Sequence, residues 1–377
     1  MKIGCLTWWR NNYGSILQAY ALQTYIEQLG DYDYEIINQY SAKMASVDNL
    51  VDKLKNCGLR RTVKRLFFRF GMPGLRARVS KLQQFVDDNL HVSKNVYNAE
   101  TITETNRYYD TFICGSDQIW NPANEPVDSI YWLQFVDKNK MKIAYAPSIG
   151  VTEFSEDESR KIIENLKGFR AVSCREDGGT ELINAVMGKE ICITVLDPTL
   201  IVDKCVWDAL CAPRKYKQNY IFAYMLRGTK EDRKMIETFA KKVRLPVVTI
   251  PFLDAENIVW YDIKFGDIKD WNPAPDEFIS LIRHAEYIFT DSFHCMVFSS
   301  MYHKQFFMLR KLGKAQMQRI HHLQKKLCLG NRIVNDNTEP EEILQMELPV
   351  WNNVDNAINK YRLISRNYLD NALTEAE

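Results

Sequence analysis

The stretch from residue 285 to residue 303 holds a histidine in a position suited to acid–base chemistry. Residues 287–289 form a short apolar run typical of a strand, Asp291 and Ser292 are residue types that begin helices, and the residues after them continue at helical spacing. A turn from a strand into a helix presents backbone N–H groups and the positive end of a helix dipole to an anion. His294 falls in the first helical turn, where an imidazole can give or take a proton beside a phosphate at neutral pH. A core helix whose histidine satisfies a buried acceptor explains this stretch alone equally well.

Two polar turns in the first half of the chain are expected at one edge of a sheet. Residues 2–8 and 111–114 are apolar runs, and each is followed by a polar turn that contains glycine. In a doubly wound α/β domain such turns open on the ligand crevice. The first turn lacks the G-x-G-x-x-G pattern, so it does not predict a dinucleotide site. The crevice residues that these turns predict are Asn12, Tyr13, Gly14, Ser116, Asp117 and Gln118.

Arg175 directly follows a further apolar run, residues 171–174. An arginine at the carboxyl end of a strand points into the crevice, where its planar guanidinium matches a carboxylate or phosphate with two parallel hydrogen bonds. A structural ion pair between Arg175 and Glu176 accounts for the same residues equally well. The pattern therefore leaves both interpretations open.

The elements that must hold these residues alternate between strand and helix along the whole chain. A chain of 377 residues exceeds what one core usually organises, so two domains are expected. The first α/β series ends in an Asp-Pro pair, and a second series begins at residue 220. We predict two doubly wound, Rossmann-like α/β domains that face a cleft, residues 1–205 and residues 206–350. The tail from 353 to 373 is helical and can pack back on the first domain.

Composition predicts a protein of the cytoplasm. The nine cysteines show no C-x-x-C pair and no spacing typical of a zinc site, and several lie inside apolar runs, so we interpret them as reduced core residues. The N-terminus reaches Arg10 too early for the apolar region of a signal peptide, and no run approaches the length of a membrane span. The sequence therefore predicts neither secretion nor a membrane span, and it predicts no metal site.

Two strongly basic blocks stand out from the rest of the chain. Residues 53–81 contain ten Lys and Arg, residues 304–332 contain eight, and neither block contains an acid, although the whole chain has a net charge of only +1. Such blocks are typical of a face that meets an anionic partner, and they are also typical of solvated helices. In the first block Phe67, Phe68 and Phe70 alternate with cations, which suits contact with a lipid headgroup layer as well as burial in the domain.

Seven motifs together resemble the polysaccharide pyruvyl transferase family. They are L-T-W-W-R-N-N-Y-G-S-I-L-Q-A-Y-A-L-Q, F-I-C-G-S-D-Q-I-W-N-P, I-A-Y-A-P-S-I-G, V-S-C-R-E, L-D-P-T-L, F-T-D-S-F-H and Q-R-I-H-H-L-Q-K-K-L-C-L-G-N-R, and the resemblance covers about residues 2 to 335. It implies the two-domain architecture of GT-B glycosyltransferases. It also implies transfer of pyruvate from phosphoenolpyruvate onto a hexose of a cell-surface polysaccharide, such as a capsule, or onto its lipid-linked precursor, as a cyclic ketal.

The resemblance also implies roles for individual residues. It makes His294 the candidate catalytic histidine, with phosphoenolpyruvate as the donor substrate and no cofactor. Many members have an arginine where this chain has Ser292, so part of the contact with the anionic donor is expected from the second basic block. The residues expected to bind the donor are Arg175, Ser292, Phe293, Arg319 and Lys314. The crevice residues of the first domain are expected to meet the saccharide acceptor.

Other functions stay open from the sequence. A GT-B glycosyltransferase that uses a nucleotide sugar would share the fold and the crevice, and a non-catalytic glycan- or lipid-binding relative is consistent with Ser292. No nucleic-acid-binding motif accompanies the basic blocks, so we expect no nucleic acid partner. An enzyme that acts on a polyprenyl-phosphate-linked acceptor would work at the inner face of the cell membrane, and residues 53–81 would supply the peripheral contact.

Overall fold

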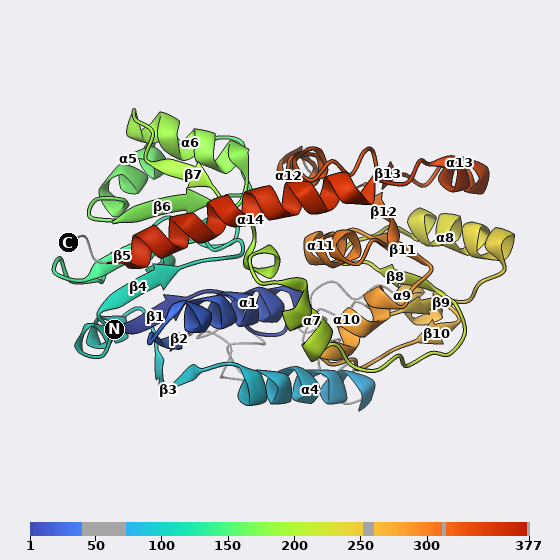
Figure 1. Cartoon of the computed structure of the whole chain (residues 1–377), viewed down its shortest axis with the longest axis horizontal. Helices are drawn as coiled ribbons and strands as arrows, with labels where there is room; N and C mark the ends of the chain where they lie inside the picture. The colour runs from blue at the N-terminus through green and yellow to red at the C-terminus, as the bar shows by residue number, and fades with distance from the viewer. Residues whose placement is uncertain (40–72, 252–259, 311–313, 375–377) are drawn as a thin grey trace, which may run out of the picture. The chain divides into compact units, whose positions relative to one another are not determined.

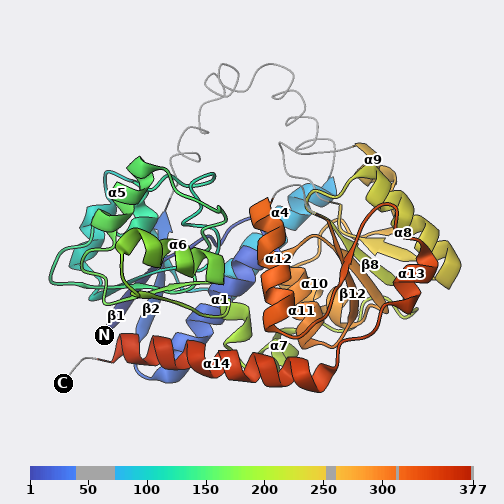
Figure 2. The ribbon, with the colours of Figure 1, turned by 90° about the horizontal axis from the view of Figure 1, so that it is seen from above.

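The computed structural model describes residues 1–39, 73–251, 260–310 and 314–374 (Figures 1 and 2). These residues form two compact units. The first unit contains residues 1–39, 86–202 and 358–374, and the second contains the other described residues. Each unit is built around its own parallel sheet, which confirms the predicted fold class of two Rossmann-like α/β domains.

The sheet of the first unit has seven parallel strands in the order β3-β2-β1-β4-β5-β6-β7. Strands added outward from β1 in both directions define a doubly wound fold, because each strand returns to the sheet through a crossover. The strands are β1 (Lys2–Leu6), β2 (Asp33–Gln39), β3 (Val92–Tyr97), β4 (Thr111–Cys114), β5 (Met141–Ala144), β6 (Ala171–Cys174) and β7 (Cys192–Thr194). The helical segments described in this unit include α1 (Tyr13–Leu29), η1 (Ile102–Arg107), η2 (Ile130–Trp132), α5 (Glu156–Asn165), α6 (Asp177–Met187) and η3 (Pro198–Leu200).

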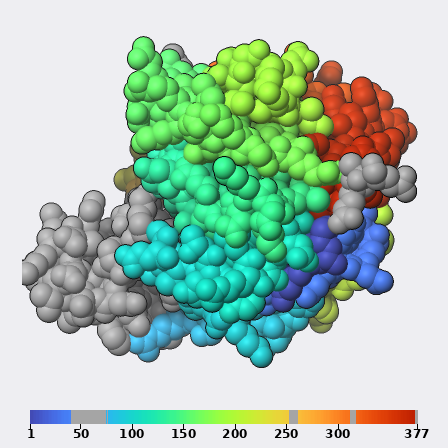
Figure 3. Space-filling view, turned by 90° about the vertical axis from the view of Figure 1, so that its left-hand side faces the viewer, coloured from blue at the N-terminus to red at the C-terminus, as the bar shows by residue number. Residues whose placement is uncertain are grey.

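The core of the first unit follows from strands that are apolar along their whole length. Parallel sheets are covered on both faces, so a central strand such as β4 is buried at every residue. Trp120 and Trp132 stack in this core with 4.2 Å between their ring centroids, and neither side chain reaches solvent. Figure 3 shows the surface of this unit, where the segment from β3 to α6, coloured cyan to green, makes up most of the visible face.

The sheet of the second unit has six parallel strands in the order β10-β9-β8-β11-β12-β13. They are β8 (Ile221–Tyr224), β9 (Val247–Thr249), β10 (Ile268–Lys269), β11 (Tyr287–Thr290), β12 (Gln305–Leu309) and β13 (Ile333–Val334). The helices described in this unit include α7 (Lys204–Leu210), α8 (Lys230–Val243), α9 (Trp260–Lys264), α10 (Pro275–Arg283), α11 (Phe293–Met301), α12 (Lys314–Lys326) and α13 (Pro340–Gln345). Helix α8 begins where its sequence predicts, because Thr229 and Asp232 form a capping box that satisfies backbone N–H groups of the first turn.

The last helix, α14 (Trp351–Leu373), contributes its residues from 358 onward to the first unit. There the hydroxyl of Ser365 accepts a hydrogen bond from the backbone N–H of Leu196 at 2.8 Å, and the hydroxyl of Tyr368 donates to the carbonyl of Ala144 at 2.8 Å. The side chains of Ser365 and Tyr368 both lie on the face of α14 that meets the sheet of the first unit. The C-terminal part of the chain is therefore tied to β5 and to the segment after β7, which precede it by more than 160 residues.

Helix α4 (Pro73–Asn89) departs from the predicted division of the chain, since its residues up to Phe85 belong to the second unit. Arg78 donates from Nε to the carbonyl of Trp271 at 2.8 Å and from Nη1 to the carbonyl of Pro251 at 2.9 Å. Lys81 forms an ion pair with Glu277 at 2.7 Å. Two cations of the first basic block, Arg78 and Lys81, therefore contact other residues of the second unit. Residues 53–72 of this block lie outside the described residues.

The second basic block is not simply one solvated helix, since part of it forms a strand. Its described residues form β12 and α12 as well as exposed turns. Arg332 is 1% exposed and donates to the carbonyl oxygens of Phe306 and Glu347 at 3.0 and 2.7 Å. Burial lowers the pKa of Arg332 to about 10, because removal from water disfavours the charged guanidinium.

Strands β3 and β12 were not predicted. Strand β3 carries polar residues on its exposed face, and β12 follows α11 after a short turn inside the cationic stretch. Among the described residues no helix is long and apolar enough to cross a membrane.

Candidate functional site

The turn after β11 is built around the carboxylate of Asp291. Its Oδ1 accepts a hydrogen bond from the backbone N–H of Leu226 at 2.6 Å, and its Oδ2 accepts one from the N–H of Arg227 at 2.8 Å. The side chain is 2% exposed. Asp291 therefore ties the turn after β11 to the turn after β8, and it does not act as the helix cap that its residue type suggested.

Ser292 starts helix α11. Its hydroxyl oxygen accepts a hydrogen bond from the backbone N–H of Cys295 at 3.4 Å, and its own N–H donates to the hydroxyl of Thr290 at 3.0 Å. Thr290 in turn donates to the carbonyl of Tyr224 on β8 at 2.6 Å. A hydroxyl at this position satisfies a free backbone donor of the first turn. An arginine side chain could not form this cap, so Ser292 has a structural role in this chain.

His294 lies at the second residue of α11, as predicted, and is 8% exposed. The aromatic ring of Phe293 packs edge to face against the imidazole with 5.4 Å between centroids. The next residue, Cys295, is fully buried, and burial raises the pKa of its thiol to about 12. The thiol therefore stays protonated at neutral pH and is no nucleophile. Histidine is the side chain of this turn that can transfer protons.

Lys314 and Arg319 lie on helix α12. They are the two cations predicted to supply the contact that many family members make through an arginine at the position of Ser292. Lys314 is the first residue of this helix, and its side chain is outside the described part of the structure. Arg319 lies in the same helix and is partly buried. Their contact with a donor stays a prediction.

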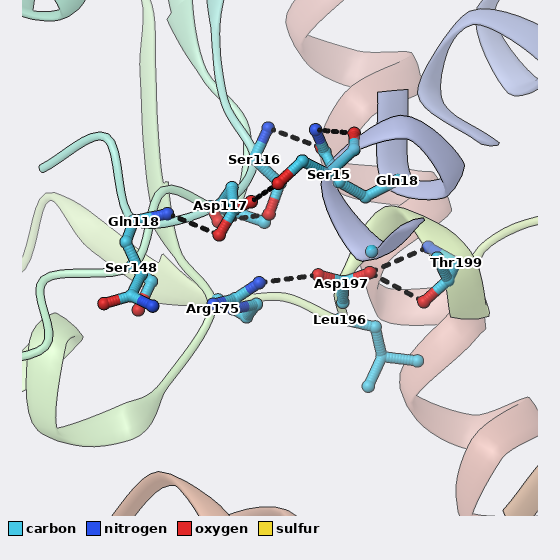
Figure 4. A network of polar contacts seen from close by, with 12 residues as sticks. Ser15, Gln18, Ser116, Asp117, Gln118, Ser148, Arg175, Leu196, Asp197 and Thr199 are labelled. Carbon is cyan, nitrogen blue, oxygen red and sulfur yellow. Dashed lines mark hydrogen bonds and ion pairs between the residues drawn. The ribbon is translucent and has the colours of Figure 1, made fainter. Parts of the chain in front are cut away.

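The crevice residues of the first unit come together at the carboxyl ends of β1 and β4 (Figure 4). Asn12 caps α1, since its side-chain oxygen accepts from the N–H groups of Gly14 and Ser15 at 2.9 and 3.3 Å. The hydroxyl of Ser15 donates to the carboxylate of Asp117 at 2.6 Å. Tyr13 is the first residue of α1 and is buried. The two predicted turns are thus joined by a hydrogen bond between Ser15 and Asp117.

Gln18 is a functional candidate that the sequence argument missed. Its amide nitrogen donates to the hydroxyl of Thr7 and to the carbonyls of Trp8 and Ser15, at 2.8–2.9 Å. Its amide oxygen accepts from the N–H of Ser116 at 3.1 Å. A glutamine among the apolar residues of a helix that was predicted to be buried on one face was the available signal, because a buried amide needs several partners.

The turn after β4 has a backbone that only certain residues can adopt. Gly115 has φ 129°, and a Cβ there would lie 1.8 Å from the carbonyl oxygen of Tyr145. Asp117 has φ 72°, and its own carboxylate accepts from the N–H of Gln118 at 2.8 Å, which stabilises this conformation. The side-chain oxygen of Gln118 accepts from Asn121 at 2.9 Å. The side chains of this turn are therefore oriented by local hydrogen bonds.

Arg175 pairs with Asp197, and the alternative pairing with Glu176 is wrong. Its Nη1 lies 2.8 Å from Oδ2 of Asp197, and both side chains are almost fully buried. Burial opposes the charge of the guanidinium, but the carboxylates of Asp197, Asp117 and Glu176 outweigh it and raise the pKa of Arg175. Figure 4 shows Arg175 between the turns after β4 and β7.

Glu176 and Asp197 each hold another segment of the backbone. Oε1 of Glu176 accepts from the hydroxyl of Ser148 at 2.9 Å and from the N–H of Ile149 at 2.8 Å. Asp197 caps η3 by accepting from the N–H and hydroxyl of Thr199 at 3.0 and 2.6 Å. The Asp197-Pro198 pair, at which the first α/β series ends, is therefore part of the network around Arg175.

The predicted site residues fall into two groups, one in each unit. Asn12, Tyr13, Gly14, Ser116, Asp117, Gln118 and Arg175 belong to the first unit, and Ser292, Phe293, His294, Lys314 and Arg319 belong to the second. Among the residues that the structure describes, no three His, Cys, Asp or Glu side chains converge as metal ligands.

The fold and these two groups define a two-domain α/β protein with polar sites at the carboxyl edges of both sheets. The family model for polysaccharide pyruvyl transferase matches residues 12–310, so the chain belongs to that family and is a transferase. No curated protein sequence matches the chain.

Two solved structures share the two-domain fold. The UDP-GlcNAc 2-epimerase from Methanocaldococcus jannaschii is 12% identical with a TM-score of 0.51, and the similarity covers 97% of this chain and 99% of the epimerase. UGT89C1 from Arabidopsis thaliana is 10% identical with a TM-score of 0.52, and the similarity covers 98% of both chains. At this identity the similarity establishes the fold alone, and it confirms the GT-B-like fold class.

Proposed function

We propose that this transferase moves the pyruvyl group of phosphoenolpyruvate onto a saccharide as a cyclic ketal and releases phosphate. The observation that carries the proposal is His294 in the first turn of α11, in a chain whose family match extends over residues 12–310. The acceptor is a hexose of a cell-surface polysaccharide or of its lipid-linked precursor. The donor binds at the carboxyl edge of the second sheet.

The chemistry of ketal formation explains why these residues suit the reaction. Two sugar hydroxyls form bonds to the central carbon of the donor, the bond from that carbon to the phosphate oxygen breaks, one proton ends on the methylene carbon, and the other leaves with phosphate. The donor carries roughly three negative charges, which the N-terminus of a helix attracts. A histidine beside the phosphate transfers protons, an effect worth about 10²–10⁴-fold in rate. No electron transfer occurs, so no redox cofactor takes part in the proposed reaction.

The test is incubation of the protein with phosphoenolpyruvate and a panel of lipid-linked and nucleotide-linked hexoses. We expect phosphate release and an equal amount of sugar whose mass has increased by one pyruvyl ketal. His294→Gln should abolish both signals while the melting temperature stays within a few degrees of wild type, because a helix-start position tolerates a polar substitution. Transfer of the hexose from a nucleotide sugar without phosphoenolpyruvate would replace the proposal with glycosyl transfer. Glycan binding without turnover with either donor would indicate a non-catalytic relative.

A further inference from the structure

Three neighbouring strands of the second sheet end beside the turn that holds His294. Strands β8, β11 and β12 are parallel and in register, with Tyr224 opposite Thr290 and Thr290 opposite Met308. The residues that follow these positions therefore share one edge of the sheet. Arg227 follows β8 by three residues and Arg310 directly follows β12. The topology places one arginine in the turn on each side of the turn that leads to His294.

The backbone N–H of Arg227 and the carbonyls of the two residues after it are bound by side chains of the same unit. Asp291 accepts a hydrogen bond from its N–H at 2.8 Å, so the position of Arg227 is tied to the turn of His294. On the other side, Arg233 donates to the carbonyls of Gly228 and Thr229, the second at 2.7 Å, and is itself paired with Asp262. Because these hydrogen bonds hold the backbone of the loop, the side chain of Arg227 extends from a fixed position.

The charges of Arg227 and Arg310 are available to a ligand. Both side chains are exposed, and within the described part of the chain neither forms a hydrogen bond or an ion pair. Other arginines of this unit are engaged, Arg233 and Arg283 with carboxylates and Arg332 with carbonyl oxygens. Asp291 is the acid of this turn, and the backbone N–H groups of Leu226 and Arg227 already occupy both of its oxygens.

We propose that Arg227 and Arg310 bind the anionic groups of the donor from the two sides of His294. This inference rests on the proposed function, since phosphoenolpyruvate offers two anionic groups, a carboxylate and a phosphate. Each matches the planar guanidinium of an arginine with two parallel hydrogen bonds. The pair supplies the cationic contact that Ser292 cannot provide, because the hydroxyl of Ser292 is used as the cap of α11.

The experiment compares Arg227→Ala and Arg310→Ala with the wild type and with a matched control, Arg244→Ala. Arg244 is an exposed arginine at the C-terminal end of α8, which leads into the opposite, amino edge of the sheet. We expect each of the first two variants to raise the Kd for phosphoenolpyruvate in calorimetry, and its KM, about tenfold or more, because charge-assisted hydrogen bonds to the donor would be lost. The KM for the acceptor and the melting temperature should not change. Arg227→Lys should bind phosphoenolpyruvate more tightly than Arg227→Ala but less tightly than the wild type, because lysine keeps the charge but cannot form two parallel hydrogen bonds.

The outcomes separate this inference from the function on which it rests. Suppose that the wild type binds and consumes phosphoenolpyruvate and that both alanine variants behave like the Arg244→Ala control. This result would overturn the roles of Arg227 and Arg310 and leave the proposed function intact. Wild type that neither binds nor consumes phosphoenolpyruvate would overturn the proposed function and this inference together. A loss of acceptor and donor affinity to the same extent in Arg227→Ala would show that the residue supports the loop and does not contact the donor.

Discussion

At the scale of single residues, the D-S-F-H stretch shows how neighbouring polar side chains take different tasks. Asp291 and Ser292 are both residue types that begin helices, yet only Ser292 caps α11. Asp291 binds two N–H groups of a turn that precedes it by more than 60 residues. Residue type predicted that the helix starts here, whereas the partner of each side chain depended on which strand lies next to β11.

Arg175 gives a prediction at this scale. Arg175→Met should lower the free energy of unfolding by about 3–5 kcal/mol, because Asp197 would stay buried without its counter-ion. Urea denaturation followed by circular dichroism measures the change. The double variant Arg175→Met with Asp197→Asn should regain part of the loss, since the asparagine oxygen can still cap Thr199 without a buried charge.

The same variants separate the structural role of Arg175 from the donor-binding role predicted from the sequence. Arg175→Met with unchanged unfolding free energy and a weakened affinity for phosphoenolpyruvate would contradict the structural role and support donor binding. Loss of stability with unchanged donor affinity, measured under conditions where the variant is folded, would exclude Arg175 as a donor ligand.

At the scale of elements, α4 shows that a basic sequence does not by itself mean an exposed surface. Arg78 and Lys81 fall in a block without acids, and both find partners on segments that lie more than 170 residues later in the chain. The sequence contains no local acid for them, so only the folded unit supplies Glu277. The predicted domain boundary could not place α4 for the same reason.

The ion pair between Lys81 and Glu277 predicts a pH dependence. Burial opposes ionisation of Glu277, but hydrogen bonds from Lys81 and from the N–H of Ala274 outweigh it and lower the pKa of Glu277. A lowered folded pKa means that the stabilisation is present above the ordinary pKa of glutamate, near 4.3, and is lost as the pH falls through the folded value. Lys81→Met should therefore cost about 1 kcal/mol or less at pH 7 and progressively less below pH 4.

Urea unfolding of wild type and Lys81→Met between pH 3 and pH 7 checks this prediction. Lys241→Met is a matched control, because Lys241 is an exposed lysine near the C-terminal end of a helix in the same unit. A difference between wild type and Lys81→Met that stays constant over the whole pH range would show that the ion pair does not contribute.

The first basic block also supports a prediction at this scale, which concerns residues outside the described part. The seven Lys and Arg of residues 53–72, a stretch without an acid, would attract an anionic membrane surface by about 1 kcal/mol for each cation close to it. Neutralising Arg60, Arg61, Lys64 and Arg65 together should reduce co-sedimentation with anionic vesicles and activity on a lipid-linked acceptor, while activity on a short soluble acceptor stays near wild type. Salt should weaken the wild-type binding, since the Debye length is about 8–10 Å at moderate ionic strength.

Two results would assign this block to another role. Wild type that fails to bind anionic vesicles at low salt would remove the membrane hypothesis. Equal loss of activity on the soluble and lipid-linked acceptors in the quadruple variant would connect the block with the fold or with the donor.

At the scale of the whole molecule, the choice of donor needs a test of its own. Solved structures that share the fold include a UDP-GlcNAc 2-epimerase, so the fold alone does not select phosphoenolpyruvate. Ligand binding to the folded state stabilises it by about 2.7 kcal/mol at a concentration 100 times the Kd. We expect phosphoenolpyruvate to raise the melting temperature by a few degrees and UDP-GlcNAc to leave it unchanged. The opposite result, measured with the same protein sample, would favour nucleotide-sugar chemistry.

The sequence by itself determined the elements whose signals are local. The apolar runs of β4 and β6 and the position of His294 after β11 were all predicted, because hydrophobic periodicity and capping residues act over a few neighbours. The seven motifs also indicated the family that the comparison confirmed. Strand β12 escaped prediction, since its apolar residues lie among cations.

Only the tertiary structure decided which distant residues meet. Arg175 pairs with Asp197 across β6 and β7, Gln18 binds the turns after β1 and β4, and Asp291 holds the backbone of Arg227. Each of these contacts depends on the order of strands in a sheet. That order is set by the packing of whole crossover units, and residue spacing along the chain does not encode it.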